Sequence, residues 1–178
     1  MPASFVIRDA RDAGDIADAR RLFEAYAASL GVDLCFQNFA HELANLPGDY
    51  APPHGCLLLA ENADRVMGCV ALRPLAQRSS DATSIGEVKR LYVDPAARAA
   101  GIGRALAEAV IGRAHAIGYE MLKLDTLATM TRARALYATL GFRECAPYYE
   151  NPLPGVFYMM LTMRTDSTPR GRAFQNPA

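Results

Sequence analysis

The sequence predicts an α/β (α+β) fold in which one mixed β-sheet is flanked by helices. Segments with apolar residues three or four positions apart, typical of helices, alternate with short apolar runs typical of strands. Their order along the chain is β-α-α-β-β-β-α-β-α-β-β. The crossover through a helix from 85–93 to 121–126 makes these two strands parallel, whereas the short link at 62–65 predicts an antiparallel hairpin. We therefore expect both strand directions in one sheet.

The first half of the chain predicts a strand, two helices and a hairpin. Between Asp12 and Leu30 apolar residues recur at the helical period, and the stretch from Asp33 to Leu46 shows the same spacing. Pro and Gly residues then mark a loop. The expected elements are a strand over 4–8, helices over 12–30 and 33–46, and strands over 56–61 and 66–75.

The second half begins with a polar loop over 77–84, followed by a strand over 85–93 that Asp94-Pro95 ends. A helix starts near Gly101, and Gly118 ends it in the usual manner of a helix C-terminus. The remaining expected elements are a strand over 121–126, a helix over 131–140, and strands over 142–145 and 156–163.

Length and charge restrict the domain organisation and the partners. A chain of 178 residues fits one domain with its own core. We assign this domain to 1–165 and a polar C-terminal tail to 166–178. The 19 basic and 19 acidic residues cancel, which argues against broad attraction to nucleic acid or to a membrane surface and leaves room for a local basic pocket.

The sequence also predicts a cytoplasmic protein without a metal. No apolar stretch approaches the length of a membrane span, and the N-terminus lacks the basic start and apolar run of a secretory signal. Neither the cysteines nor the three histidines have the spacing of metal ligands. Reduced, mostly buried thiols are the simplest interpretation of the cysteines, which are Cys35, Cys56, Cys69 and Cys145.

The segment 98–104, Arg-Ala-Ala-Gly-Ile-Gly-Arg, has the features of an anion site. It follows a strand and a turn and opens a helix, whose N-terminal N–H groups and dipole favour phosphate. Glycines let a ligand approach the backbone, and Arg98 and Arg104 add donors. A glycine-tolerant turn with solvated arginines is the alternative. The segment is not a P-loop, because G-x-x-x-x-G-K-S/T is absent, and Leu106 replaces the third glycine of the dinucleotide fingerprint.

Three segments together resemble signatures of the GNAT N-acetyltransferase superfamily. Arg98-x-x-Gly101-x-Gly103 matches the pattern R/Q-x-x-G-x-G/A in full. The strand 87–93 is similar to the fourth strand of that family, and 137–142 resembles its Y-x-x-x-G-F segment. The three occur in the family's order, and the resemblance covers about residues 3–164 by element order. It implies a mostly antiparallel sheet with a central, parallel, splayed strand pair.

The resemblance implies acetyl-CoA as the donor of an acetyl group. Its pantetheine arm would pair with backbone groups of Leu91 and Val93, which the splayed strands leave free. Its pyrophosphate would meet N–H groups of 99–104, and a backbone N–H near Tyr92 would stabilise the oxyanion that forms during transfer. The implied cofactor-binding residues are Leu91, Tyr92, Val93, Arg98, Ala99, Ala100, Gly101, Ile102, Gly103 and Arg104.

Two residues are candidates for catalysis. Glu87 is a plausible base, directly or through water, and strand alternation places it on one face with Lys89, Leu91 and Val93. The alternative is an ion pair of Glu87 with Lys89 or another cation. The resemblance makes the Tyr137 hydroxyl the acid that protonates the departing thiolate, and a core tyrosine is the alternative.

One departure from the family pattern is visible. Many relatives carry an asparagine that helps to hold the cofactor arm, and this chain has Met130 at that position. Thr129 and Thr131 are the candidates to replace the contact.

The acceptor is predicted only as a class. In the family, the first two helices and the late strands recognise it, and the loop 147–155 offers either an aromatic wall or a proline-stiffened connection. A small-molecule amine, an amino acid among others, is the default, because no peptide-binding module is attached. A sensor of acetyl-CoA without catalysis, a protein-lysine acetyltransferase and an enzyme for longer acyl groups are the alternatives, and the family implies a possible homodimer. The candidate acceptor residues are Tyr26, Arg73, Tyr148 and Tyr149.

Overall fold

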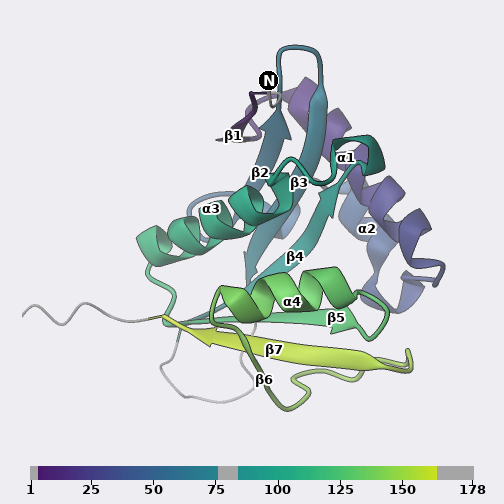
Figure 1. The fold of residues 1–178 in the computed structure, drawn as a ribbon, viewed down its shortest axis with the longest axis vertical. Coiled ribbons are helices and arrows are strands. Elements are labelled where there is room, and N and C mark those ends of the chain that lie inside the picture. The colour runs from purple at the N-terminus through teal and green to yellow at the C-terminus, as the bar shows by residue number, and fades with distance from the viewer. Residues whose placement is uncertain (1–3, 76–83, 164–178) are drawn as a thin grey trace, which may run out of the picture.

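The computed structural model describes residues 4–75 and 84–163 (Figure 1). The expected loop 77–84, apart from Ser84, and the expected tail 166–178 lie outside these residues. The elements are β1 (Val6–Asp9), α1 (Ala13–Leu30), η1 (Cys35–Gln37), α2 (Phe39–Ala44), η2 (Gly48–Tyr50), β2 (Cys56–Glu61), β3 (Val66–Pro74), β4 (Ile85–Val93), η3 (Pro95–Ala97), α3 (Ile102–Ile117), β5 (Met121–Leu127), α4 (Thr131–Thr139), β6 (Arg143–Glu144) and β7 (Val156–Thr162).

The described strands form one sheet in the order β1-β2-β3-β4-β5-β7-β6. All neighbouring strands are antiparallel except β4 and β5, which are parallel. The crossover between these two strands runs through α3. The predicted fold class, a mixed and mostly antiparallel sheet flanked by helices, is confirmed.

The parallel pair opens halfway along its length. Pairing between β4 and β5 ends at Glu87 and Lys123. Beyond that point β4 stays paired with β3 as far as Val93, and β5 stays paired with β7 as far as Leu127. The second half of β4 therefore has one edge that β5 does not cover, which confirms the predicted splayed pair.

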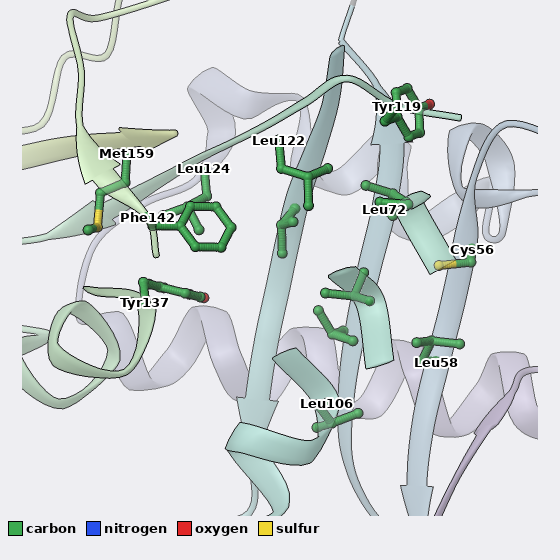
Figure 2. Packing of buried hydrophobic residues seen from close by; sticks show 14 of the residues in the cluster. Cys56, Leu58, Leu72, Leu106, Tyr119, Leu122, Leu124, Tyr137, Phe142 and Met159 are labelled. Carbon is green, nitrogen blue, oxygen red and sulfur yellow. The ribbon is translucent and has the colours of Figure 1, made fainter. Parts of the chain in front are cut away.

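The two faces of the sheet carry separate hydrophobic clusters. α3 and α4 cover one face, and α1 and α2 cover the other (Figure 1). Leu106 of α3 and Leu122 of β5 are fully buried on the first face (Figure 2). Phe23 of α1 and Tyr50 of η2 pack edge to face on the second, with ring centroids 6.0 Å apart. Apolar residues are therefore needed on both faces of the central strands, which explains their nearly continuous apolar runs.

The long α1 forms as expected, but the second predicted helix is interrupted. The Asp12 side chain accepts a hydrogen bond from the Asp15 amide at the start of α1, and Gly31 ends the helix in the left-handed region. Over 33–46 the chain forms η1 and then the short α2, because Asn38 between them has a φ of 56°. Asparagine tolerates this left-handed conformation better than most residues do, and the helical period alone does not detect the break.

A β-bulge in β4 overturns one expectation. Cys69 is paired with Tyr92 and Ala71 with Lys89, so a single β3 residue faces both Arg90 and Leu91. The extra residue, Arg90, has a φ of 60° and reverses the alternation of side chains. Leu91 and Val93 consequently pack on the α3 face, where Val88 is also buried. The prediction that Glu87 and Lys89 share a face with Leu91 and Val93 was therefore wrong.

Candidate active site

A groove of about 810 Å³ lies beside the open edge of β4. Its walls come from the end of β4 (91–93), the loop into α3 (97–103) and the start of α4 (129–136), together with Tyr26 and Ser29 of α1. The groove thus joins most of the predicted cofactor residues with the segment around Met130. Ala100 and Arg104 do not belong to its lining.

The N-terminus of α3 presents backbone N–H groups to this groove. Gly101 is the N-cap, and no side chain caps the first turn, so the amides of Ile102 and Gly103 have no side-chain acceptor. A Cβ atom at Gly101 would meet no atom within 4 Å, and one at Gly103 only Val93 Cγ2 at 3.8 Å. Both glycines therefore border open space. Uncapped amides, a helix dipole and room for a ligand together suit a phosphate group.

The two arginines of the loop occupy different surroundings. Arg98 Nε donates to the Val93 carbonyl at 3.2 Å, and its guanidinium lies 5.9 Å from the centre of the Tyr92 ring. Arg98 therefore stays at the groove. Arg104 instead donates to Glu108 at 3.2 Å and to Thr139 at 2.9 Å, which ties it to the outer surface of α3 and α4.

A narrower cavity occupies the opening between β4 and β5. Residues 88–91 of β4 and 125–127 of β5 line it, together with side chains from α1, α4 and the loop 147–155. Three residues line both this cavity and the groove, so the two spaces adjoin. They are Tyr26, Leu91 and Met130.

Tyr137 projects from α4 into this opening. Its ring packs against Phe142 with centroids 5.5 Å apart (Figure 2), and it also lines the cavity. Burial, together with the nearby Tyr26 phenol and Asp125 carboxylate, raises the pKa of Tyr137 well above its ordinary value. The hydroxyl therefore stays protonated at neutral pH, and it combines a core contact with a position at the opening.

Glu87 lies behind the cavity wall and is absent from its lining. Its side chain is 2% exposed. One carboxylate oxygen accepts from Arg73 Nε at 2.8 Å, and the other accepts from the Tyr148 hydroxyl at 3.0 Å. Lys89 Nζ lies 3.6 Å from that second oxygen. The ion pair that the sequence left as an alternative is therefore present, and it is buried.

Lys89 and Asp125 are functional candidates that sequence reasoning missed. Lys89 Nζ donates to Asp125 Oδ1 at 3.0 Å, and the Tyr149 hydroxyl donates to Oδ2 at 2.9 Å. Burial alone would raise the pKa of Asp125, but the Lys89 charge and these hydrogen bonds lower it below the usual range. A signal existed, because each residue is a charge inside a predicted strand and directly follows an apolar residue, Val88 or Leu124.

Arg90 is the second buried cation at the cavity. Its Nε and Nη2 donate to the two carboxylate oxygens of Glu42 at 2.9 and 2.6 Å, and Nη1 donates to Gln37 at 2.9 Å. The Tyr50 hydroxyl donates to the same Glu42 at 2.7 Å. Burial opposes the charge of Arg90, but the paired carboxylate keeps its pKa raised. The bulge thus fixes a cation where β4 meets α2.

The predicted acceptor residues surround this network. Tyr148, Tyr149 and Tyr158 form an aromatic cluster with centroids 5.3 to 5.7 Å apart. Gln37 Nε2 donates to the Tyr149 hydroxyl at 3.2 Å, which connects η1 with the late loop across the cavity. Burial raises the pKa of Tyr26 to about 12. Of these residues Tyr26 reaches the cavity lining, whereas Tyr148 and Tyr149 support it from behind.

Arg73 lines a different cavity of about 140 Å³, between α2, η2 and the sheet. Glu42 and Asp49 belong to the same lining, and Gln37 borders both this cavity and the one at the splayed strands. The predicted acceptor residues are therefore divided between two neighbouring spaces.

A family model for the acetyltransferase (GNAT) family matches residues 19–142. This chain belongs to the GNAT acetyltransferase family. A relative of similar length, an uncharacterised N-acetyltransferase of Schizosaccharomyces pombe, is 38% identical over 163 residues, which cover 91% of this chain and 97% of the relative. The match to the family spans β4, the loop into α3, and α4.

Two solved structures share the GNAT fold with this chain. A GNAT acetyltransferase from Staphylococcus aureus superposes with a TM-score of 0.72 at 19% identity, over 90% of this chain and 100% of that one. A protein from Salmonella typhimurium, solved with its cofactor acetyl-CoA, superposes with a TM-score of 0.64 at 20% identity, over 93% and 97%. At these identities the likeness concerns the fold.

Met130, the departure from the GNAT pattern, lies where the groove and the cavity meet. Its sulfur accepts a hydrogen bond from the Thr126 hydroxyl at 3.7 Å. Thr129 and Thr131 both line the groove. These threonines are thus in a position to contact a cofactor arm that an asparagine would hold in relatives.

Within the described residues, no group of three or more His, Cys, Asp and Glu side chains is arranged to hold a metal ion. Over the same part of the chain, no helix has the length and apolar character that a membrane crossing requires.

Proposed function

We propose that this GNAT protein transfers an acetyl group from acetyl-CoA to the primary amine of a small molecule, directly, with both substrates bound. One observation carries the proposal. A groove that starts at an uncapped helix N-terminus continues to the opening between β4 and β5, where Tyr137 lies. One continuous space thus joins a helix N-terminus suited to the phosphates of acetyl-CoA to the Tyr137 hydroxyl, which can donate a proton.

Acetyl-CoA supplies an acetyl group activated as a thioester. In this chain, the amides of Ile102 and Gly103 hold the pyrophosphate, and the uncovered edge of β4 at Leu91 pairs with the extended arm. Arg98, which borders the groove, adds positive charge. No cysteine belongs to the lining of the groove or of the cavity at the splayed strands, which favours direct transfer over an acetyl-cysteine route.

The acceptor nitrogen forms a bond to the acetyl carbon while the carbon–sulfur bond breaks. The Tyr137 hydroxyl gives its proton to the sulfur that leaves, and the proton lost by the amine restores the Tyr137 hydroxyl through solvent. The raised pKa keeps the phenol fully protonated before transfer, and it also makes the phenol a weaker acid, so the proton moves only as negative charge develops on the sulfur.

Glu87 is proposed as a positioning residue. Both of its oxygens are engaged and its side chain does not reach the cavity. It orients Lys89, which lines the cavity, and Tyr148, which lies behind it. The predicted base function of Glu87, directly or through water, stays the alternative to this positioning role.

A small acceptor is favoured over a protein lysine by the hydrogen bond between Gln37 and Tyr149. This contact ties η1 to the loop 147–155 beside the cavity that Gln37 lines, so a peptide would have to separate these two segments to lie between them. A cytoplasmic location, which the sequence predicts, and a homodimer, which only the family implies, are further parts of the proposal.

The experiment is a thiol-release assay with acetyl-CoA and a panel of amines, combined with a binding measurement for CoA. Tyr137→Phe keeps the packing on Phe142 and is expected to lower kcat by about 100-fold, within the range for general acid catalysis, with little change in the KM for acetyl-CoA. Tyr119→Phe is the matched control, because its hydroxyl bonds the His54 carbonyl and it lines neither space. Its kcat should equal that of the wild type.

Glu87→Gln separates the two roles of that residue. If Glu87 is a positioning residue, the variant lowers kcat and leaves the shape of its pH profile unchanged. If Glu87 is the base, the variant removes the acidic limb of that pH profile. CoA binding without release of thiol for any amine would instead favour a sensor and overturn the proposed function.

A further inference from the structure

The acceptor cavity has two cationic side chains and one acidic side chain on its wall. Lys89, Arg90 and Asp125 are its charged lining residues among those described. Lys89 and Arg90 are 6% and 2% exposed as side chains. The other acids of the network, Glu42 and Glu87, hold these cations from behind and do not line the cavity.

Both cations have more N–H donors than their hydrogen bonds to described residues use. Arg90 donates through Nε, Nη1 and Nη2 to Glu42 and Gln37, while a guanidinium has five N–H groups. Lys89 Nζ has one hydrogen-bond partner among the described residues, Asp125, while an ammonium has three N–H groups. Two cations with unused N–H donors bind an acceptor of opposite charge, such as a carboxylate, most strongly.

The backbone at Arg90 supports a role in binding. A non-glycine residue at a φ of 60° is strained, and such strain persists where surrounding structure enforces it, often beside a ligand. The bulge moves Arg90 out of the strand register and places its guanidinium 5.9 Å from the Tyr26 ring, which also lines the cavity.

We infer that the acceptor is an amino acid, whose carboxylate binds between Lys89 and Arg90 and whose amine points to the opening beside Leu91 and Tyr137. The inference rests on the proposed function and narrows its substrate class. An alkylammonium without a carboxylate would leave the unused N–H donors of these two cations without an acceptor. An amino acid brings its own counter-charge.

The test compares amines that differ only in the carboxylate. Phenylalanine is paired with 2-phenylethylamine, lysine with cadaverine, and each amino acid also with its amide. The wild-type chain should release thiol with at least one free amino acid at a kcat/KM at least tenfold above its decarboxylated and amidated partners. This panel needs no variant, so it does not depend on the folding of a mutant.

Lys89→Met tests whether the preference for the free amino acid depends on Lys89. The double variant Lys89→Met with Asp125→Asn removes the whole ion pair, so that Asp125 is not left as a buried charge without a partner. In both variants, the ratio of kcat/KM for the amino acid to kcat/KM for its decarboxylated partner should fall towards one, while the KM for acetyl-CoA stays the same. Lys123→Met, in the neighbouring strand and outside the lining, should keep the preference.

The outcomes separate the inference from the proposed function. Equal or faster release with the decarboxylated amines overturns the inference and leaves the acetyltransferase standing. Binding of CoA without release for any amine of either kind overturns both.

Discussion

Two carboxylates illustrate how the surroundings of a residue decide its role. Glu87 and Asp125 both lie on strands at the splayed pair, and both contact Lys89. Asp125 borders the cavity, whereas Glu87 is enclosed by Arg73, Tyr148 and Lys89. A carboxylate could act as a base at either position. Only the contacts of each side chain show which of the two carboxylates borders the acceptor cavity.

At the same scale, Asp15 connects the first strand with α1 and makes stability depend on pH. The hydrogen bonds from Arg8, with further contacts from Arg11, lower the pKa of Asp15 to about 2. A carboxyl with a lowered pKa in the folded state stabilises it above the unfolded pKa of about 4. This contribution is lost as the pH falls from about 4 towards 2.

Asp15→Asn is therefore expected to lower the free energy of unfolding at pH 7 by roughly 1.5 kcal/mol, typical of a hydrogen bond to a charged group. Urea unfolding at several pH values should show the difference from wild type shrinking below pH 4. Asp18→Asn, on the exposed side of the same helix, should show almost no difference at any pH. A constant difference for Asp15→Asn down to pH 2 would contradict the argument.

At the scale of elements, the N-terminus of α3 and the bulge of β4 shape the site. The first presents free amides to the groove, and the second moves Leu91 to one face of the sheet and Arg90 to the other. Both depend on backbone conformations rather than on a reactive side chain. A change in either element should therefore alter binding more than folding.

Gly103→Glu tests the first element with a matched control. A Cβ atom fits there, since its nearest neighbour is Val93 Cγ2 at 3.8 Å, and an acid near a helix N-terminus is favourable for the dipole. The melting temperature should stay within a few degrees of wild type. The new carboxylate repels a pyrophosphate, so the KM for acetyl-CoA should rise by at least about tenfold.

Gly112→Glu adds the same charge to the same helix at an exposed position where a Cβ atom meets nothing within 4 Å. Its KM for acetyl-CoA should equal that of the wild type. If both variants bind acetyl-CoA normally, the groove at α3 is not the donor site. Gly101 is less suitable for this test, because its φ of 81° would strain any other residue.

At the scale of the whole molecule, the sheet separates two hydrophobic clusters that must fold together. Central strands contribute to both, as Cys69 and Val70 of β3 do on opposite faces. Loss of packing on one face should therefore destabilise the complete domain in a single transition.

Leu106→Ala is expected to lower the free energy of unfolding by about 3 kcal/mol, the usual cost of a truncated and fully buried leucine. Urea unfolding followed by circular dichroism measures it, and the denaturant dependence should match wild type. Val6→Ala, at a residue that is 55% exposed, should cost less than about 0.5 kcal/mol. Two separate transitions for Leu106→Ala would show that the clusters unfold independently.

Much of the fold follows from local patterns, and the failures have local causes. The strand-like segment over 85–93 and the glycine after Ile117 predicted β4 and the end of α3 at the residues where they occur. The helix over 33–46 failed at Asn38, whose left-handed backbone the period does not show. The prediction of the sheet face on which Leu91 lies failed because a β-bulge depends on the pairing with the partner strand.

The sequence by itself determined the element order, the GNAT membership, the anion-suited loop at 98–104 and the candidacy of Tyr137. These depend on periodicity and short motifs, which neighbouring residues encode. Only the tertiary structure decided that Glu87 is enclosed and that Lys89, Arg90 and Asp125 form the charged wall of the cavity. Their contacts join β4 to β5, to α2 and to the late loop. The pairing of buried charges is fixed by distances in the folded chain, and spacing along the sequence does not carry those distances.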